Sequence, residues 1–411
     1  MLRGMIRVAL VLIALLGALC GCATSPRPIT ADLSLALPTS STNIARVLAS
    51  PETYRVQVLI AEVITNRDGR AELRRSGLRV DAEYFYPASS IKLCAAVAAL
   101  QTIEQLQSQE RTSDLVETPV EIAPLFPGDP AQTNDTSNFG SGSITIGQEI
   151  RKIGLVSDNQ AYNRLYDLVG HEGLNCSMHA LGLQSTVLNH RLSETRTIPD
   201  MLATAAVTFR GPNGEPIVVP ARRSQLTLTN ASNNLLIGAG YMKGDQLISE
   251  PMDFSRRNGI SLVDLQDLLV KVTRPDIDLG TPTLQLSPAH RELLLQAMSL
   301  YPRESKNPVY PAERYPDLAS KFLLPGIRRV FPNAQPGERI EVTGKPGRAY
   351  GFSIENSYVR NQANGRAVFV TAMLYTNSDG VLNDDKYDYE TIADGFLADL
   401  GAWVARRYLQ D

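Results

Sequence analysis

The sequence contains few histidines and has no excess of basic residues. The chain has only four histidines, and none of them stands in an HExxH motif or another metal-binding spacing. Its 40 lysines and arginines are outnumbered by 43 acidic residues, which gives a formal net charge of −3. The composition argues against a histidine-based metal site and against a basic surface for nucleic acid. We therefore expect no metal ion, no cofactor and no nucleic-acid partner.

The apolar run near the N-terminus is too short to span a membrane. Arg3 and Arg7 lie at its start, and it ends in small residues and cysteine before reaching the ~20 residues that a spanning helix needs. We predict a secretory signal over residues 1–21. Its last letters, LCGC, resemble the bacterial lipobox, which implies cleavage before Cys22 and lipidation of the Cys22 thiol. The protein would then face the periplasm on a lipid anchor. Inner-membrane lipoproteins of Gram-negative cells often carry Asp after the anchor cysteine, so by this resemblance Ala23 favours the outer membrane.

Cysteine is rare as well, with four residues in the chain. Cys20 would leave with the signal and Cys22 would carry the lipid, so only Cys94 and Cys176 remain for the folded part. An oxidising compartment permits a disulfide between them. Cys94 lies in an apolar helical run, however, where a buried free thiol is the more common state. The sequence leaves both possibilities open.

The remaining chain divides into a tether and one folded domain. Residues 22–41 are rich in proline, serine and threonine, which is typical of a flexible connection to a membrane. Residues 42–411 show no internal repeat and have a length that a single catalytic domain with an insertion can reach. We expect this domain to be monomeric.

The first part of the domain predicts a helix, a β-hairpin and a second, buried helix. The helix is expected over about residues 42–50, and two extended runs separated by an Asn-Arg-Asp-Gly turn follow over residues 54–80. The pattern changes at Pro87, after which the alanine- and leucine-rich run "SSIKLCAAVAALQTIEQL" predicts a buried helix beginning near Ser89.

Ser89 and Lys92 form a Ser-x-x-Lys pair at the start of that helix. Residues three apart share one helix face, and the serine lies at the positive end of the helix dipole. Serine needs an adjacent base to act as a nucleophile, and a desolvated lysine can supply one. The same pattern also fits a helix-capping serine beside a solvated lysine.

Two further motifs carry polar groups that could face the same cleft. Ser157-Asp158-Asn159 interrupts a helical stretch that begins with a capping threonine, Thr145; Ser157 could relay a proton and Asn159 could bind a substrate amide or Lys92. An ordinary interhelical turn uses the same residue types. Later in the chain, Lys345-Pro346-Gly347 lies beside predicted strands, where lysine could bind a carboxylate and glycine permits close approach. Alone, it is also a common turn.

In this order, the three motifs resemble those of the class A β-lactamase and penicillin-binding family of serine hydrolases. The order of predicted elements resembles the family from about residue 42 to 411, including the helix pair "GISLVDLQDLLVKV" and "LSPAHRELLLQAM" and a final amphipathic helix. The resemblance implies an α+β fold in which an antiparallel β-sheet flanked by helices packs against an all-α lobe. The active site would lie between the sheet and the lobe.

The resemblance also implies roles for the motif residues. Ser89 would be the acylated nucleophile, Lys92 its proton acceptor and Ser157 the proton donor to the leaving nitrogen. Asn159 and Lys345 would position the substrate, the latter through its carboxylate. The backbone N–H groups of Ser89 and Arg348 would form the oxyanion hole, with Gly347 beside them.

The resemblance is incomplete in three places. Glu194, 37 positions after Ser157, is the candidate for the base that activates the deacylating water, but two residues separate it from Arg191 where the family pattern has one. It could instead be a loop carboxylate paired with Arg191 or solvent. Pro346 replaces the usual threonine or serine and removes a hydroxyl for carboxylate binding. An insertion over about 209–254, with a predicted small hairpin at its start, either extends the cleft or decorates a remote surface.

We therefore predict a serine hydrolase that forms an acyl-enzyme at Ser89 and hydrolyses a β-lactam or a related cyclic amide. One alternative is a D-Ala-D-Ala peptidase acting on peptidoglycan. Another is a cell-wall binding protein that has kept the cleft without turnover. The expected partner is in each case a β-lactam or a small peptidoglycan-derived substrate.

Overall fold

The fold was analysed in a computed structural model of the 411-residue chain. It describes residues 7–8, 28–112, 114–138, 140–210, 215–306, 309–332 and 340–410. The predicted lipidation site, Cys22, and most of the predicted signal lie outside these residues.

A β-hairpin forms at the position that the sequence predicts. Strands β3 (Gln57–Thr65) and β4 (Ala71–Leu78) pair antiparallel. The side chain of Asn66 fixes the turn between them by accepting hydrogen bonds from the backbone N–H groups of Asp68 (3.0 Å) and Arg70 (2.9 Å). Gly69 follows in the left-handed region with φ 77°, a conformation that glycine adopts without strain.

The late strands complete a seven-stranded sheet around this hairpin. They are β14 (Ile340–Gly344), β15 (Gly347–Ala349), β16 (Phe352–Asn361) and β17 (Ala367–Tyr375). The order is β14-β16-β17-β3-β4-β2, with β15 also on β16. Every pair is antiparallel except β2 (Ala31–Asp32) on β4. Nearly all residues of β16 and β17 are buried, so both faces of the sheet are covered.

Three helices cover one face of the sheet: α1 (Thr42–Leu48), α9 (Leu324–Val330) and α10 (Asp394–Val404). Their apolar side chains join those of β3, β14 and β17 in one hydrophobic cluster. The predicted first and last helices are thereby confirmed. Their burial against the sheet supplies the hydrophobic stabilisation of this layer.

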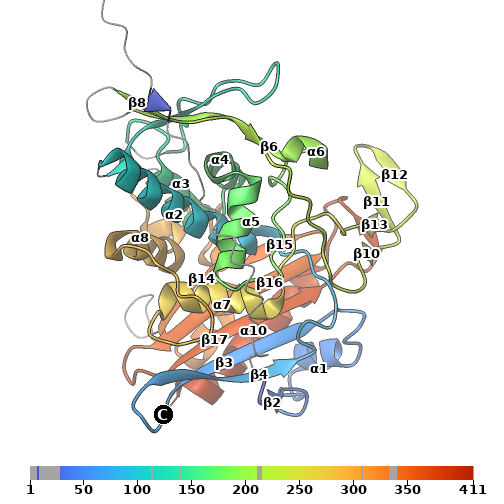
Figure 1. Cartoon of the computed structure of the whole chain (residues 1–411). Coiled ribbons are helices and arrows are strands. Elements are labelled where there is room, and N and C mark those ends of the chain that lie inside the picture. Colours follow the sequence, from blue (N-terminus) through green and yellow to red (C-terminus); the bar gives the residue numbers. More distant parts are fainter. Residues whose placement is uncertain are drawn as a thin grey trace, which may run out of the picture.

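The opposite face of the sheet meets α7 (Leu262–Thr273) and, beyond it, a lobe rich in helices (Figure 1). The lobe contains α2 (Lys92–Glu110), α3 (Ile146–Val156), α4 (Asn159–Val169), α5 (His171–Ala180), the short α6 (Ile198–Met201) and α8 (Pro288–Ser299). The predicted α+β class, with an antiparallel sheet and a helical lobe, is confirmed. Within the described ranges, no helix is both long and apolar enough to cross a membrane.

A small sheet adds to the helical lobe, in the order β1 (Arg7–Val8), β8 (Pro216–Val219), β7 (Val207–Arg210) and β5 (Val120–Ile122). The β7–β8 pair is antiparallel and confirms the small hairpin predicted at the start of the insertion. The short strands β6 (Ala203–Thr204) and β9 (Arg222–Arg223) pair beside it.

The second half of the insertion reaches the main body of the protein. Strands β10 (Leu236–Ile237) and β13 (Met252–Asp253) pair with each other, and β11 (Gly240–Lys243) forms a hairpin with β12 (Gln246–Ile248). Strand β11 also pairs in parallel with β18 (Val381–Leu382), from the segment before the C-terminal helix. The insertion is therefore attached to a late segment of the chain.

Cys94 and Cys176 are both free thiols, which answers the question that the sequence leaves open. Cys94 is fully buried in α2, and burial raises the pKa of its thiol to about 12. It therefore behaves as a small apolar core residue.

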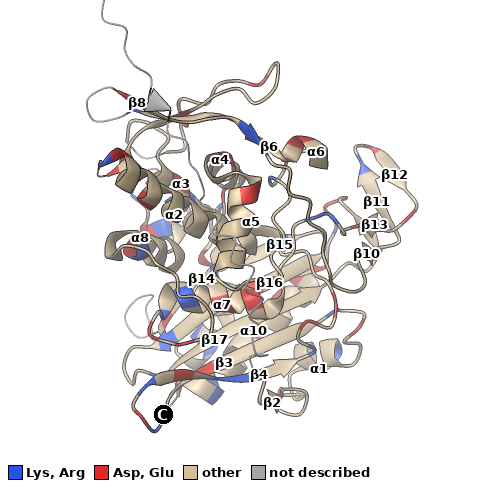
Figure 2. Cartoon of the chain, viewed as in Figure 1, with Lys and Arg blue, Asp and Glu red and all other residues tan. Residues whose placement is uncertain are grey.

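Charged residues of both signs are interspersed along β4 and over the helices (Figure 2).

Candidate active site

Ser89 lies where a short 3-10 helix, η1 (Ala88–Ile91), leads into α2. The neighbouring Ser90 is fully buried, and its hydroxyl donates to the carbonyl of Pro87 at 2.6 Å. Ser89 instead lines an open cleft. Ala88 has φ 49°, a conformation that costs a non-glycine residue energy and is concentrated at functional sites. The backbone thus directs one of two adjacent serines into the cleft.

Lys92, one turn further on, is fully buried. Its Nζ donates to the carbonyl and the hydroxyl of Ser157, the latter at 3.2 Å, and to Asn159 Oδ1 at 2.7 Å. Burial, together with the nearby charge of Lys345, holds the pKa of Lys92 well below its usual range. The predicted contact between Asn159 and Lys92 is present, and the lowered pKa favours the neutral amine that a base requires.

The Ser-Asp-Asn segment combines a structural turn with two groups that face the site. Helix α3 ends at Ser157 in the left-handed region, with φ 57°. Asp158 caps α4 by accepting from the Ala161 N–H at 2.8 Å. The interhelical turn is therefore present, and its capping residue places both neighbouring side chains in contact with Lys92.

Lys345 contacts the same hydroxyl from the sheet side. It follows β14, is 2% exposed, and donates from Nζ to Ser157 Oγ at 2.9 Å and to the Pro346 carbonyl at 2.8 Å. Burial lowers the pKa of Lys345 to about 7. Two amines from different parts of the fold thus converge on one serine hydroxyl.

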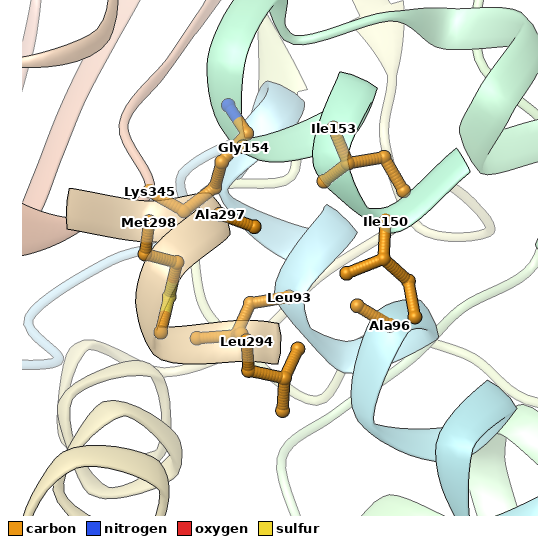
Figure 3. A pocket seen from close by; sticks show the side chains of 9 residues that line it. All are labelled: Leu93, Ala96, Ile150, Ile153, Gly154, Leu294, Ala297, Met298 and Lys345. Atoms are coloured by element: carbon orange, nitrogen blue, oxygen red, sulfur yellow. The ribbon is translucent and has the colours of Figure 1, made fainter. Parts of the chain in front are cut away.

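An apolar cavity explains part of this desolvation. Lys345 stands at its edge, and the rest of its lining comes from α2, α3 and α8 (Figure 3). The lining side chains are Leu93, Ala96, Ile150, Ile153, Leu294, Ala297 and Met298, with Gly154. The stem of Lys345 is therefore surrounded by apolar groups, which disfavour its charged form.

Gly347 and Arg348 lie beside Ser89, and the arginine head is held by other residues. A Cβ on Gly347 would meet the backbone N of Ser89 at 2.5 Å. The guanidinium of Arg348 pairs with Asp394 and lies 4.1 Å from the ring centroid of Phe322. Arg348 lines the cleft together with Ser89.

Aromatic residues that the sequence did not single out form the far wall of the cleft. They are Tyr86, Tyr350, Tyr387 and Tyr389. Tyr350 has φ 53° and makes an edge-on contact with Tyr86, with ring centroids 5.1 Å apart. Phe254, at the end of the insertion, packs on Tyr350 with centroids 5.7 Å apart. The insertion therefore packs against the cleft wall through Phe254, although none of its described residues lines the cleft itself. The sequence contains no short motif that would have identified these tyrosines.

Glu194 is not brought together with Ser89 and Lys92. Its carboxylate accepts from Asn163 Nδ2 at 3.2 Å and from Arg196 Nε at 3.2 Å, and it lines a separate hollow with Arg196 and Asp129. The preceding residue, Ser193, lines the cleft and accepts from Asn159 Nδ2 at 2.7 Å. The expected pairing of Glu194 with Arg191 is also absent, since Arg191 pairs with Asp167 at 2.5 Å.

A buried ionic network, also missed from sequence, supports the Ser-Asp-Asn turn. Lys152 is 1% exposed and lies 2.9 Å from Asp135 and 3.4 Å from Asp158. Arg164 on α4 pairs with the same Asp135 at 2.6 Å and with Glu149 at 2.9 Å. The network joins α3 to α4, and only the tertiary structure brings its members together. Among the described residues, no three histidine, cysteine or acidic side chains cluster in a metal-binding arrangement.

A buried lysine beside a cleft serine, joined to a second serine on a helical turn, is an arrangement that can support acyl transfer through the serine. The family comparison agrees with this class. A model of the β-lactamase enzyme family matches residues 41–402, and the chain belongs to this family. A comparison with curated proteins finds no match.

Several solved β-lactamase structures align with this chain over most of their length. A β-lactamase from Desulfarculus baarsii DSM 2075 shares 16% identity, covering 90% of this chain and 98% of its own, with a TM-score of 0.48. One from Burkholderia ambifaria shares 13% identity over 88% and 97%, with a TM-score of 0.48. A putative class A β-lactamase, PenP, from Rhodopseudomonas palustris shares 16% identity over 90% and 99%, with a TM-score of 0.47. The family assignment rests on the family model.

Proposed function

We propose that this protein is a serine hydrolase that is acylated at Ser89 by a β-lactam or a related cyclic amide and then hydrolyses the acyl-enzyme. The observation that carries the proposal is the convergence of Lys92 and Lys345 on the Ser157 hydroxyl beside Ser89. This arrangement supplies a base for the nucleophile, a route for a proton and a binding group for a carboxylate.

The acylation step follows from these positions. The neutral amine of Lys92 accepts the Ser89 proton, and Ser89 Oγ attacks the carbonyl carbon of the ring amide. The backbone N–H groups of Ser89 and Arg348 stabilise the negative oxygen that forms. When the C–N bond breaks, Ser157 donates its proton to the leaving nitrogen, and the Lys92 ammonium returns a proton to Ser157.

Two residues orient the substrate for this step. The ammonium form of Lys345 binds the carboxylate of the substrate, since a buried cation beside an open cleft attracts an anion strongly. Asn159 donates to a substrate carbonyl through its amide nitrogen, while its Oδ1 holds Lys92. The ring-opened acyl group remains on Ser89 as an ester.

A second candidate, a D-Ala-D-Ala peptidase acting on peptidoglycan, is favoured by one observation. Glu194 is bound to Asn163 and Arg196 and does not line the cleft with Ser89. Fast hydrolysis of the acyl ester on Ser89 would require a base in the cleft. A peptidase uses the same acylation machinery on a different amide, and β-lactams then label it as slow substrates.

The two functions differ in the fate of the adduct. Purified protein is incubated with a labelled penicillin, and its intact mass is followed over time. Formation and eventual complete loss of a one-to-one adduct supports the β-lactamase, whether loss is fast or slow, and an adduct that is not released supports the peptidase. If no adduct forms at saturating penicillin, the proposal is wrong.

The cellular setting remains a proposal from sequence. A lipid on Cys22 would hold a monomeric domain at the outer membrane, facing the periplasm, where β-lactams and peptidoglycan fragments are encountered. A Cys22→Ser substitution is expected to move the protein from the membrane fraction to the soluble periplasmic fraction. Unchanged membrane association would contradict the anchor.

A further inference from the structure

We infer that release of the acyl group is the slow step at this site, because the 190s loop presents the Ser193 hydroxyl to the cleft and holds the Glu194 carboxylate outside it. This inference rests on the proposed acylation of Ser89. It identifies Ser193 as the position that sets the lifetime of the acyl-enzyme.

Hydrolysis of the Ser89 ester requires a proton acceptor near the ester carbon. A water oxygen attacks this carbon and gives up a proton to a base. The bond between the carbon and Ser89 Oγ then breaks, and Ser89 Oγ regains a proton. A positioned base contributes about 10²- to 10⁴-fold to such a step.

Ser193 occupies the place in the cleft where this base would be useful. Its hydroxyl accepts from Asn159 Nδ2, and the same side-chain amide accepts from Lys92 through Oδ1. Asn159 thus links Ser193 directly to the catalytic lysine. A hydroxyl can relay or accept a hydrogen bond, but it does not retain a proton at neutral pH as a carboxylate does.

Glu194 is held one helical turn away from this position. It binds Asn163, four residues after Asn159 on α4, and four residues of helix correspond to a rise of about 6 Å. Its second oxygen accepts from Arg196, which in turn binds both oxygens of Asp129 at 2.8 and 2.9 Å. The Glu194 carboxylate is therefore held by Asn163 and Arg196, on the side of the loop opposite to the cleft.

The register of the loop is fixed directly before Ser193. Arg191 is 2% exposed, pairs with Asp167 and donates to the Ala203 carbonyl at 3.0 Å. The backbone N–H of Leu192 donates to Asn163 Oδ1 at 2.9 Å, and Asn163 Nδ2 donates back to the Leu192 carbonyl at 3.0 Å. Turning Glu194 into the cleft would break buried hydrogen bonds, each worth about 1 kcal/mol or more.

Two other carboxylates near the site, those of Asp158 and Asp385, do not take the place of Glu194 as a base. Asp158 caps α4 and lies 3.4 Å from Lys152. Asp385 is the one acidic residue among the described residues that line the cleft. It is exposed, and it also borders the neighbouring hollow around Met242 and Asp379, so it belongs to the outer rim.

The test measures acyl lifetime separately from acylation. The acyl-enzyme is formed with a labelled penicillin, excess reagent is removed, and loss of the adduct is followed by intact mass. Wild type is expected to lose it at about one per minute or slower, against the ~10 s⁻¹ of a typical enzyme turnover. Ser193→Glu is expected to shorten the lifetime at least about tenfold. Ser193→Gln, of equal size without the charge, should not.

Glu194→Gln and Asp385→Asn test the same inference by removing carboxylates instead of adding one. Their outcome does not depend on whether Ser193→Glu folds. Both are expected to change the wild-type lifetime less than about twofold. Fast release by wild type that slows tenfold or more in either variant would overturn the inference while leaving acylation at Ser89 intact. Absence of any adduct would overturn the proposed function and the inference together.

Discussion

Gly347 lies directly against the backbone of Ser89, and a Cβ there would come within 2.5 Å of Ser89 N and 2.7 Å of Ser90 N. This contact fixes the distance between the edge of the sheet and the start of α2. It therefore sets the geometry of the oxyanion hole assigned to Ser89 and Arg348.

Gly347→Ala is expected to lower the acylation rate about 100-fold or more, since a misplaced oxyanion-hole donor costs about 10²–10³ in rate. The rate is measured by stopped-flow mixing with a chromogenic β-lactam. Gly395→Ala in α10 is the matched control, because its Cβ meets only the end of the Asn43 side chain. An equal loss in both variants would indicate general destabilisation.

Pro346→Thr is expected to improve recognition of substrates that carry a carboxylate. A hydroxyl at this position adds a charge-assisted hydrogen bond, worth about 1.5 kcal/mol, and so lowers KM roughly tenfold. Steady-state kinetics or acylation rates measure the change. Pro346→Val matches the shape of threonine without the hydroxyl, and an equal improvement in the valine variant would refute this explanation.

The acylation rate should fall as the pH rises through about 7. Burial lowers the pKa of Lys345 to about 7, so its cationic form predominates below that pH and is lost above it. Lys92 has its pKa well below the usual range and is the base in its neutral form, so it sets the acidic limb. The profile of kcat/KM reports these pKa values for the free enzyme.

Lys345→Arg tests the alkaline limb, because arginine keeps its charge over this range. The variant should acylate more slowly because its fork-shaped head differs from an ammonium. Its rate should nevertheless show no decline near pH 7. A decline at the same pH in both proteins would assign that limb to another group.

Lys152→Met should destabilise the protein by about 3–5 kcal/mol, since it breaks a buried ion-pair network and leaves Arg164 as the remaining cation beside Asp135 and Glu149. Lys152 is 1% exposed and lies close to Asp135, Glu149 and Asp158. Urea unfolding measures the change. Arg151→Met, which removes the exposed pair with Glu117, is the matched control and should cost less than about 1 kcal/mol.

Local patterns in the sequence predict much of this fold. The Asn-Arg-Asp-Gly turn, the capping Thr145 and the period change near Ser89 each correspond to the predicted element. Ser89, Lys92, Ser157, Asn159 and Lys345 stand at a helix start, a helical break and a strand end, each of which has its own local pattern. These features depend on residues that are close in sequence.

The remaining features depend on contacts between distant segments. Glu194 has the sequence spacing of a base, but its direction is set by Asn163, Arg196 and the anchored Arg191. Likewise, Tyr350 becomes part of the cleft wall through packing on Phe254, 96 positions earlier in the chain. Neither relationship has a local pattern from which it could be predicted.

Mapping the site of acylation tests the central claim most directly. The protein is labelled with penicillin, digested and analysed by tandem mass spectrometry, with Ser89→Ala labelled in parallel. We predict one penicilloyl group on Ser89, and none on the Ser89→Ala protein. A label on Ser90, Ser157 or any other residue, or equal labelling of the alanine variant, would contradict the assignment of Ser89 as the nucleophile.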